Sequence, residues 1–322
     1  MDWNLNNPYW IACVFFALNL TGLWAYYRAG YWFGVVDEAG NRSSHQGQIV
    51  TGAGIVLMVI LSVAGWLADL DVLLIAAIAL LTLVGFIDDK LDLPKSVRLL
   101  TQLISIGLLF YLLGLQQQPV WLVIILAFLT VWWLNLFNFM DGANGMAGLH
   151  ILACCSWYVL MFQSDSGMEI ESLGFLVILS SGAYLLFNFP KAVLFMGDSG
   201  SLPFALILAS LALTGILSGI LSYWQVAVLH AVFISDASYT LMLRMRRKEK
   251  FWQPHNTHIY QRFIKIGHPH WLVSLAYAVI TVVLGLVAWW MKSMGQWTQM
   301  SVVGGIYVIL LVIFMKTKQL KR

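Results

Sequence analysis

The chain has 322 residues, of which 60% are hydrophobic and only 10% are charged, and its mean hydropathy is +0.80. A soluble domain carries about a quarter charged residues, so this composition excludes an ordinary soluble protein and predicts a polytopic helical membrane protein. The net charge is only +3, with the basic residues in loops between apolar segments, so nothing indicates nucleic-acid binding.

Uncharged segments recur along the whole chain at about the 20 residues that a helix needs to cross a bilayer. The N-terminus lacks the basic region and cleavage site of a signal peptide, so the first segment is expected to be a retained span. Residues 99–140 divide at the QQQP sequence of 116–119, and residues 199–235 divide near Ser218 to Tyr223, with the second part continuing to about Leu243. The sequence thus predicts eleven spans in a single domain, 1–322, the others being 8–27, 46–68, 72–87, 142–164, 172–190, 271–291 and 293–315.

The positive charges predict the orientation of these spans. With the N-terminus outside, 17 of the 18 Lys and Arg residues fall in inner loops or the C-terminal tail, and only Lys292 falls outside. Cytoplasmic loops of membrane proteins carry such an excess. We therefore expect an all-α bundle of about 11 transmembrane helices in the lipid bilayer, with the N-terminus outside and the C-terminus cytoplasmic.

Every cluster of residues with catalytic chemistry falls in a loop that this orientation makes cytoplasmic, and no outer loop holds one. The three cysteines, Cys13, Cys154 and Cys155, lie in apolar segments without metal-ligand spacing or a disulfide framework, which indicates inert packing. The clusters are DEAGNRSSH (37–45), DDKLDLPKSVR (88–98), NLFNFMDGANGMAG (135–148), FNFPKAVLFMGDSGS (187–201) and RRKEKFWQPHNTHIYQR (246–262).

Carboxylates dominate three of these loops. Asp88 and Asp89 follow an apolar run directly, where their mutual repulsion favours a bound cation, although a solvated helix end is the alternative. Carboxylate oxygens suit Mg²⁺, which takes one or two of them together with substrate phosphates. Asp141 lies in a Gly-rich stretch that could also be a plain turn, and Asp198 lies between glycines before a span, where a helix N-terminus would bind an anion.

The last loop carries the basic residues. His255, His258 and Arg262 are spaced i, i+3 and i+7, which would align them on one helical face toward an anionic ligand. A zinc site is the alternative, but no Cys or third suitably spaced ligand supports it. The run from Arg244 to Lys250 is typical of a cluster that sets topology and binds lipid head groups.

Carboxylates for a metal and a basic loop for phosphates, both beside a membrane, predict phosphoryl transfer at the inner-leaflet interface. A transporter is the main alternative, but transport paths are usually marked by charges within spans, and here Asp236 is the exception in nearly uncharged interiors. Asp236 could orient the loops or pair with a basic residue. A non-catalytic scaffold is the third alternative.

These five motifs, in this order from about Asp37 to Arg262, resemble the polyprenyl-phosphate N-acetylhexosamine-1-phosphate transferases of glycosyltransferase family 4. That family includes phospho-MurNAc-pentapeptide translocase and the enzymes that initiate O-antigen synthesis. The resemblance implies a multi-pass enzyme of the bacterial inner membrane with its active site on the cytoplasmic face. Such an enzyme uses Mg²⁺, with Mn²⁺ as a substitute, and moves a sugar 1-phosphate from a UDP-sugar to undecaprenyl phosphate, releasing UMP. The resemblance also admits a homodimer.

The resemblance assigns roles to residues that match the family motifs. Asp198 and Asp89 resemble metal ligands, and Asp88 and Asp89 resemble the catalytic pair. Phe195 matches the uracil-stacking position. The other implied catalytic residues are Asp141, His255, His258 and Arg262, and the implied substrate-binding residues are Asn41, Arg42, His45, Asn138, Asn144, Asn188, Phe195 and Gly197.

Two departures bear on the branch of the family. Many members have an aspartate where this chain has Asn144, and the peptidoglycan translocases have three consecutive histidines where this chain reads HNTH. These departures favour the branch that starts O-antigen or related surface glycans, with N-acetylglucosamine as the default sugar. Transfer of phospho-MurNAc-pentapeptide is the alternative within the family.

Overall fold

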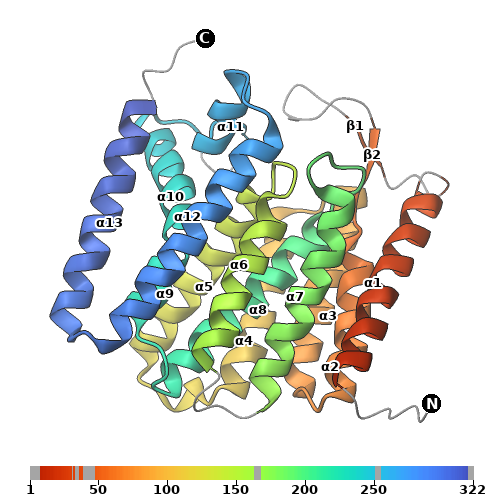
Figure 1. Cartoon of the computed structure of the whole chain (residues 1–322), viewed down its shortest axis with the longest axis horizontal. Helices are drawn as coiled ribbons and strands as arrows, with labels where there is room; N and C mark the ends of the chain where they lie inside the picture. Colours follow the sequence, from red (N-terminus) through yellow and green to blue (C-terminus); the bar gives the residue numbers. More distant parts are fainter. Residues whose placement is uncertain are drawn as a thin grey trace.

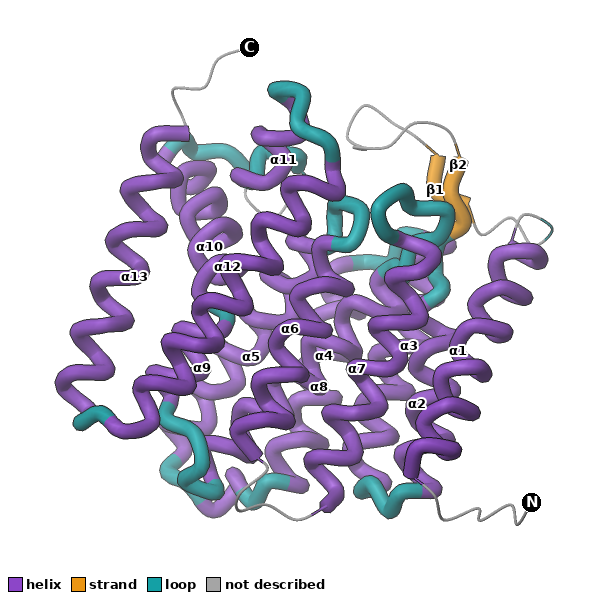
Figure 2. The backbone as a smooth tube through the Cα atoms, viewed as in Figure 1, coloured by secondary structure: helices purple, strands orange, loops and turns teal. Residues whose placement is uncertain are grey.

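The computed structural model describes residues 8–30, 32, 36–38, 48–162, 168–250 and 255–317 as a bundle of helices that run roughly along one common direction (Figure 1). Two short strands and a small helix, α11, lie at the end of the bundle where α13 finishes, and α1 starts at the opposite end (Figure 2). The helices are α1 (Pro8–Gly30), α2 (Gly54–Leu67), α3 (Val72–Leu91), α4 (Lys95–Leu112), α5 (Val120–Met140), α6 (Met146–Phe162), α7 (Met168–Asn188), α8 (Asp198–Leu217), α9 (Tyr223–Leu229), α10 (Ala231–Arg246), α11 (Ile259–Lys265), α12 (His270–Trp290) and α13 (Gln296–Thr317), with 3₁₀ turns η1 (Leu115–Gln117) and η2 (Met291–Ser293) and strands β1 (Val36–Glu38) and β2 (Gln48–Val50).

The all-α polytopic class is confirmed. Eight helices of the described chain are long and apolar enough to cross a membrane, and α9 with α10 forms a ninth candidate that is bent by 74°. The apolar helices α2 and α6 are shorter, with 14 and 17 residues. The count of eleven spans and the orientation of the termini stay predictions.

The predicted breaks between spans are confirmed, and each has a local cause. Pro119 precedes α5, because proline lacks the amide hydrogen and suits the start of a helix. Ser222 precedes α9, where its hydroxyl accepts from the Gln225 amide at 3.2 Å while the Gln225 side chain accepts from the Ser222 amide at 2.9 Å. This reciprocal capping box fixes the helix start after the polar break.

The expectation of a helix from residue 46 is wrong at its beginning. Strand β2 pairs antiparallel with β1, in the register Val36 with Val50, and α2 begins only at Gly54. Val50 also forms a parallel bridge with Leu194, and its carbonyl accepts from the Phe195 amide at 2.8 Å. Because these pairings use the backbone groups of Val50, the segment is held against the loop that leads into α8.

Helix α8 is the centre of the bundle. Buried residues make up 78% of its apolar window, against 17% for α1 and 22% for α13. Two helix glycines bring neighbouring backbones against its first turn: a Cβ on Gly54 would lie 2.1 Å from the Gly200 nitrogen, and one on Gly85 would lie 2.7 Å from the carbonyl of Asp198. Because these positions lack a side chain, α2 and α3 hold the start of α8 in a fixed place.

Candidate active site

Asp89, in the last turn of α3, caps the N-terminus of α8. Its Oδ1 accepts from the Asp198 amide at 2.8 Å, and its Oδ2 accepts from the Ser199 amide at 3.3 Å. The positive end of the helix dipole favours a carboxylate there. Gly197 precedes the helix with φ +66°, and a Cβ on it would lie 2.3 Å from Asp89 Oδ2, so only glycine fits.

Asp88, the neighbouring carboxylate, is joined to Asp198 through Arg98 at the start of α4. The Arg98 guanidinium lies 3.1 Å from Asp88 Oδ2 and 2.7 Å from Asp198 Oδ2. Asp88 also accepts from the Leu93 amide at 2.7 Å. The turn between α3 and α4 thus places the Arg98 guanidinium between the carboxylates of Asp88 and Asp198. Three charged side chains from three helices meet at this point.

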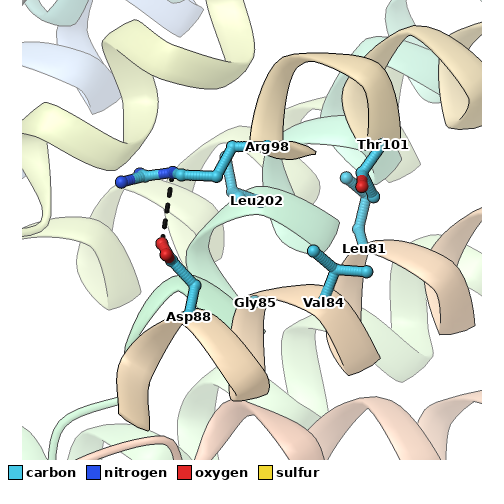
Figure 3. Close-up of a pocket in the computed structure, with 7 residues that line it drawn as sticks. All are labelled: Leu81, Val84, Gly85, Asp88, Arg98, Thr101 and Leu202. Carbon is cyan, nitrogen blue, oxygen red and sulfur yellow. Dashed lines mark ion pairs between the residues drawn. The ribbon is translucent and has the colours of Figure 1, made fainter. Parts of the chain in front are cut away.

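The Asp88–Arg98 pair borders a small pocket between α3, α4 and α8 (Figure 3). The dashed line in Figure 3 marks the ion pair, with apolar side chains on the other side of the pocket. The Asp88–Arg98 ion pair and apolar side chains therefore lie side by side in this pocket. The pocket is lined by Leu81, Val84, Gly85, Asp88, Arg98, Thr101 and Leu202.

The end of α5 supplies a further contact to Asp198. The Asn138 amide nitrogen donates to Asp198 Oδ1 at 2.7 Å and lies 2.8 Å from the Ser201 hydroxyl. Asp141 follows as the residue that ends α5, and burial, reinforced by the charges of Asp198 and Asp89, raises its pKa well above the usual range. The coupling among these carboxylates means that Asp141 faces the same site.

The four carboxylates of Asp88, Asp89, Asp141 and Asp198 have the chemistry of a Mg²⁺ site, since hard oxygen ligands of this kind are the ones that Mg²⁺ takes. The electrostatic coupling of Asp141 to Asp198 and Asp89 is the second reason, because excess negative charge in one place is relieved by a cation. Within the described part of the chain, no three of them bring oxygens within 4.8 Å of one another. The donor set therefore fits Mg²⁺ when substrate phosphates complete the coordination.

Two residues predicted to contact the nucleotide, Asn144 and Asn188, join loops in the structure, and their role toward a nucleotide stays a prediction. Asn188 is buried, accepts from the Gly145 amide at 2.6 Å and donates to the Leu194 carbonyl at 2.8 Å. Asn144 donates to the Pro190 carbonyl at 3.2 Å. These bonds connect the loop after α5 to the loop before α8. Both loops lie near β1 and β2 at one end of the bundle (Figure 2), and Phe195 is half-buried there.

The predicted helical face of His255, His258 and Arg262 is wrong, because α11 begins only at Ile259. The two histidines precede the helix with their rings stacked at a centroid distance of 4.7 Å. His258 is buried, with Nδ1 3.6 Å from Asp236 Oδ1, whereas Arg262 donates to the Thr257 carbonyl at 3.0 Å. Only His255 and Arg262 of the three keep partial exposure toward a ligand.

His255 is neutral at pH 7 in this arrangement. Burial, with smaller contributions from His258 and Arg244, lowers its pKa to about 3. An uncharged imidazole donates or accepts hydrogen bonds but adds no charge for a phosphate. His255 therefore adds no positive charge to this loop.

Asp236, whose role the sequence left open, anchors residues 255–260, which form the histidine loop. Its carboxylate accepts from the Ile259 and Tyr260 amides at 2.8 and 3.0 Å and from the Tyr277 hydroxyl at 2.6 Å. The Tyr260 hydroxyl then donates to the Phe139 carbonyl at 3.0 Å, beside Asp141. Asp236 thus connects α10, α11 and α12 to the end of α5.

Sequence reasoning missed Arg98 and Ser201 and could not place Asp236. Arg98 was counted only as a cation that sets topology, and its ten-residue separation from Asp88 gives no signal of an ion pair. The predicted residues Asn41, Arg42 and His45 lie outside the described residues.

Fold and site together define a multi-pass membrane protein with a carboxylate-rich centre at one end of its bundle. The family model described as glycosyl transferase family 4 matches residues 72–216, which contain Asp88, Asp89, Arg98, Asn138 and Asp198. Over these residues the chain is similar to glycosyl transferase family 4.

Relatives of this chain carry two kinds of name. A probable undecaprenyl-phosphate N-acetylglucosaminyl 1-phosphate transferase of Bacillus subtilis is 28% identical over 88% of this chain and 83% of its own length. A decaprenyl-phosphate N-acetylglucosaminephosphotransferase of Mycobacterium leprae is 27% identical over 65% of this chain and 61% of its own. A phospho-N-acetylmuramoyl-pentapeptide-transferase of Fervidobacterium nodosum is 29% identical over 51% of this chain and 58% of its own.

Proposed function

We propose that the protein transfers an N-acetylhexosamine 1-phosphate, by default that of N-acetylglucosamine, from a UDP-sugar to undecaprenyl phosphate, releasing UMP. The single observation that carries the proposal is the junction of Asp88, Asp198 and Arg98, where acidic and basic groups meet beside apolar side chains. The diphosphate of the donor is bound and neutralised by a metal cation and an arginine. The phosphate of the lipid acceptor is bound by a charged group that lies beside apolar side chains.

Asp198 and Asp89 would hold Mg²⁺, with Asp141 nearby, and the bound ion would neutralise charge on the donor diphosphate. Arg98 has a side chain 29% exposed, so it can exchange a carboxylate for a phosphate oxygen of a substrate. Asn138 fixes Asp198 Oδ1 and so sets the direction of that carboxylate.

Asp88 is the residue that we assign as the base toward the acceptor phosphate. Asp89 is engaged as the hydrogen-bond acceptor for the N-terminus of α8, whereas Asp88 lines the pocket that has apolar walls. An oxygen of the lipid phosphate would form a bond to the β-phosphorus of the donor as the bond from that phosphorus to the bridging oxygen breaks, and UMP would leave. Catalysis of this kind depends mostly on positioning and charge neutralisation.

The N-acetylglucosamine reading is favoured over phospho-MurNAc-pentapeptide transfer by how far the relatives match. The Bacillus relative aligns with 88% of the chain, whereas the Fervidobacterium relative aligns with 51%. The HNTH sequence, in place of three consecutive histidines, supports the same choice. We further propose the initiating step of O-antigen or a related surface glycan, at the cytoplasmic face of a bacterial inner membrane, with a homodimer as the assembly to test.

The direct test is UMP release by purified protein in nanodiscs with Mg²⁺, undecaprenyl phosphate and a panel of UDP-sugars, with the lipid product identified by mass. We expect turnover with UDP-N-acetylglucosamine. Asp88→Asn, Asp89→Asn and Asp198→Asn should each lower the rate by about 100-fold or more. Asp92→Asn is the matched control, because Asp92 is an exposed carboxylate with φ 49°, a conformation that asparagine tolerates.

Two results would overturn the proposal. One is the absence of UMP with every donor from protein that remains folded and monodisperse. The other is movement of a UDP-sugar across proteoliposomes without cleavage, which would support a transporter instead.

A further inference from the structure

A second polar cluster lies deep in the bundle, away from the carboxylates. His150 and Cys154 are one turn apart on α6, and His230 lies at the break between α9 and α10. All three side chains are buried, with exposed fractions of 1%, 0% and 3%. Within the described residues this is the one group of three whose ligand atoms lie close enough together to hold a metal ion.

The three ligand atoms form a nearly equilateral triangle. His150 Nε2 lies 3.1 Å from His230 Nδ1 and 3.3 Å from Cys154 Sγ, and Cys154 Sγ lies 3.5 Å from His230 Nδ1. A point equidistant from atoms with these separations lies about 1.9 Å from each, close to the ~2.0 Å nitrogen and ~2.3 Å sulfur distances of bound zinc. A shift of a few tenths of an ångström would complete a three-ligand site.

The outward nitrogens of both histidines are held by hydrogen-bond partners, as is usual for metal-binding histidines, and here these partners are hydroxyl groups. The Thr281 hydroxyl donates to the Tyr277 carbonyl at 3.0 Å, so it must accept from His150 Nδ1, 3.1 Å away. His150 is thereby left with a lone pair on Nε2, directed into the triangle. His230 Nε2 lies 2.8 Å from the Tyr158 hydroxyl.

A metal-free arrangement is the alternative to be tested. Tyr158 would donate to His230 Nε2, and His230 Nδ1 would donate to His150 Nε2, giving a continuous hydrogen-bonded chain. The Cys154 thiol then competes for an acceptor that is already occupied. A hydrogen-bonded series of this kind does not need the Cys154 sulfur beside the two histidine nitrogens. A metal site does need a third ligand atom there, so the position of Cys154 favours the metal site.

We propose that His150, Cys154 and His230 bind one thiophilic d¹⁰ metal ion, Cu⁺ or Zn²⁺, at the break of the α9–α10 helix pair. Soft thiolate and imidazole ligands select these ions. On binding, the Cys154 thiol gives up its proton to solvent and the thiolate bonds to the ion, with no change of oxidation state.

The charge of the site favours Cu⁺ over Zn²⁺. One thiolate and two neutral imidazoles with Cu⁺ give a neutral site, whereas Zn²⁺ would leave a net positive charge among buried apolar side chains. The surroundings are aromatic: the Phe233 ring stacks on His150 at 3.7 Å, and the Trp133 ring lies 4.5 Å from His230. The ion would link α6 to the point where α9 and α10 meet at 74°, and so fix that bend.

The test uses the full chain, produced in copper- or zinc-supplemented cells and purified in detergent without chelators. Metal content would be measured by mass spectrometry, and affinity for Cu⁺ by anaerobic competition with a chromophoric chelator. We expect about one ion per chain in the wild type and in Cys155→Ser, and under a tenth of that in Cys154→Ser. Cys155 is the matched control, because it is equally buried on the same helix.

Wild-type protein alone gives a second readout, so the test does not depend on the variant folding. X-ray absorption at the metal edge should report two nitrogens and one sulfur, and stripping the ion should lower the thermal midpoint of unfolding. Fewer than a tenth of an ion per chain for both metals, or full retention by Cys154→Ser, would overturn the proposal and leave a hydrogen-bonded core cluster only. Tighter Zn²⁺ than Cu⁺ binding would overturn the charge argument.

Discussion

Removing the Asp236 carboxylate should detach the histidine loop from the bundle. Three strong donors point at it, the Ile259 and Tyr260 amides and the Tyr277 hydroxyl, at 2.8, 3.0 and 2.6 Å. A hydrogen bond to a charged group contributes ~1.5–3 kcal/mol, and a buried donor left without a partner costs a similar amount. Because neighbouring effects overlap and water can enter the loop, we expect Asp236→Ala to lower the free energy of unfolding by about 3–5 kcal/mol.

The remaining variants of this series follow from the same contacts. Asp236→Asn keeps one acceptor oxygen but turns an amide group toward a donor, so a loss of about 2 kcal/mol is expected. Tyr277→Phe removes one bond and should cost about 1–2 kcal/mol. Thr240→Val is the control, since its 3.3 Å contact to Asp236 is the longest of the set.

Thermal unfolding in detergent, with limited trypsin digestion at the basic residues 244–250, is the assay. Asp236→Ala should lower the unfolding midpoint by on the order of 10 °C and speed cleavage beside α11. An unchanged midpoint together with an unchanged digestion rate would refute the reasoning that Asp236 anchors this loop.

Four further predictions concern other parts of the structure. Asp198→Asn should lower the rate of UMP release by about 100-fold or more without lowering the unfolding midpoint, and retained activity would remove Asp198 from the reaction. Arg98→Ala should raise the KM for the UDP-sugar about tenfold or more, and a Lys replacement should restore only part, because lysine cannot bridge two acids in a planar fork. Gly54→Ala should destabilise the fold by more than 2 kcal/mol through its clash with α8, whereas Gly107→Ala, with open space around it, should be neutral in thermal unfolding. Because the folded-state pKa of His255 is lowered to about 3, its neutral form stabilises the fold above pH ~6.5 and this stability is lost as the pH falls toward 3; His255→Gln should flatten that part of the pH–stability curve.

The class of fold follows from the amino-acid sequence alone. Long uncharged segments require helices in a bilayer, because every backbone amide and carbonyl there must be satisfied internally, and proline and polar breaks mark where helices end. The divisions at 116–119 and near Ser218 to Tyr223 were placed correctly for this reason. The same reasoning failed at residues 46–53, because strand pairing with β1 and the bridge to Leu194 depend on distant segments.

The residue types of the site were also readable, since adjacent carboxylates at the end of an apolar run have few structural uses. Asp88, Asp89, Asn138 and Asp198 do meet, through hydrogen bonds, ion pairs or shared backbone contacts. These residues could be picked out because each belongs to a short motif that is visible in the local sequence.

Which groups lie opposite one another depends on how the helices pack. Arg98 between Asp88 and Asp198, Asp236 beneath the histidine loop, and Cys154 beside two histidines each depend on helices that are far apart in the chain. Sequence periodicity gives the face of one helix but not its rotation against another, because that rotation is fixed by close packing, here by glycines such as Gly54 and Gly85. These pairings are therefore a property of the packed bundle.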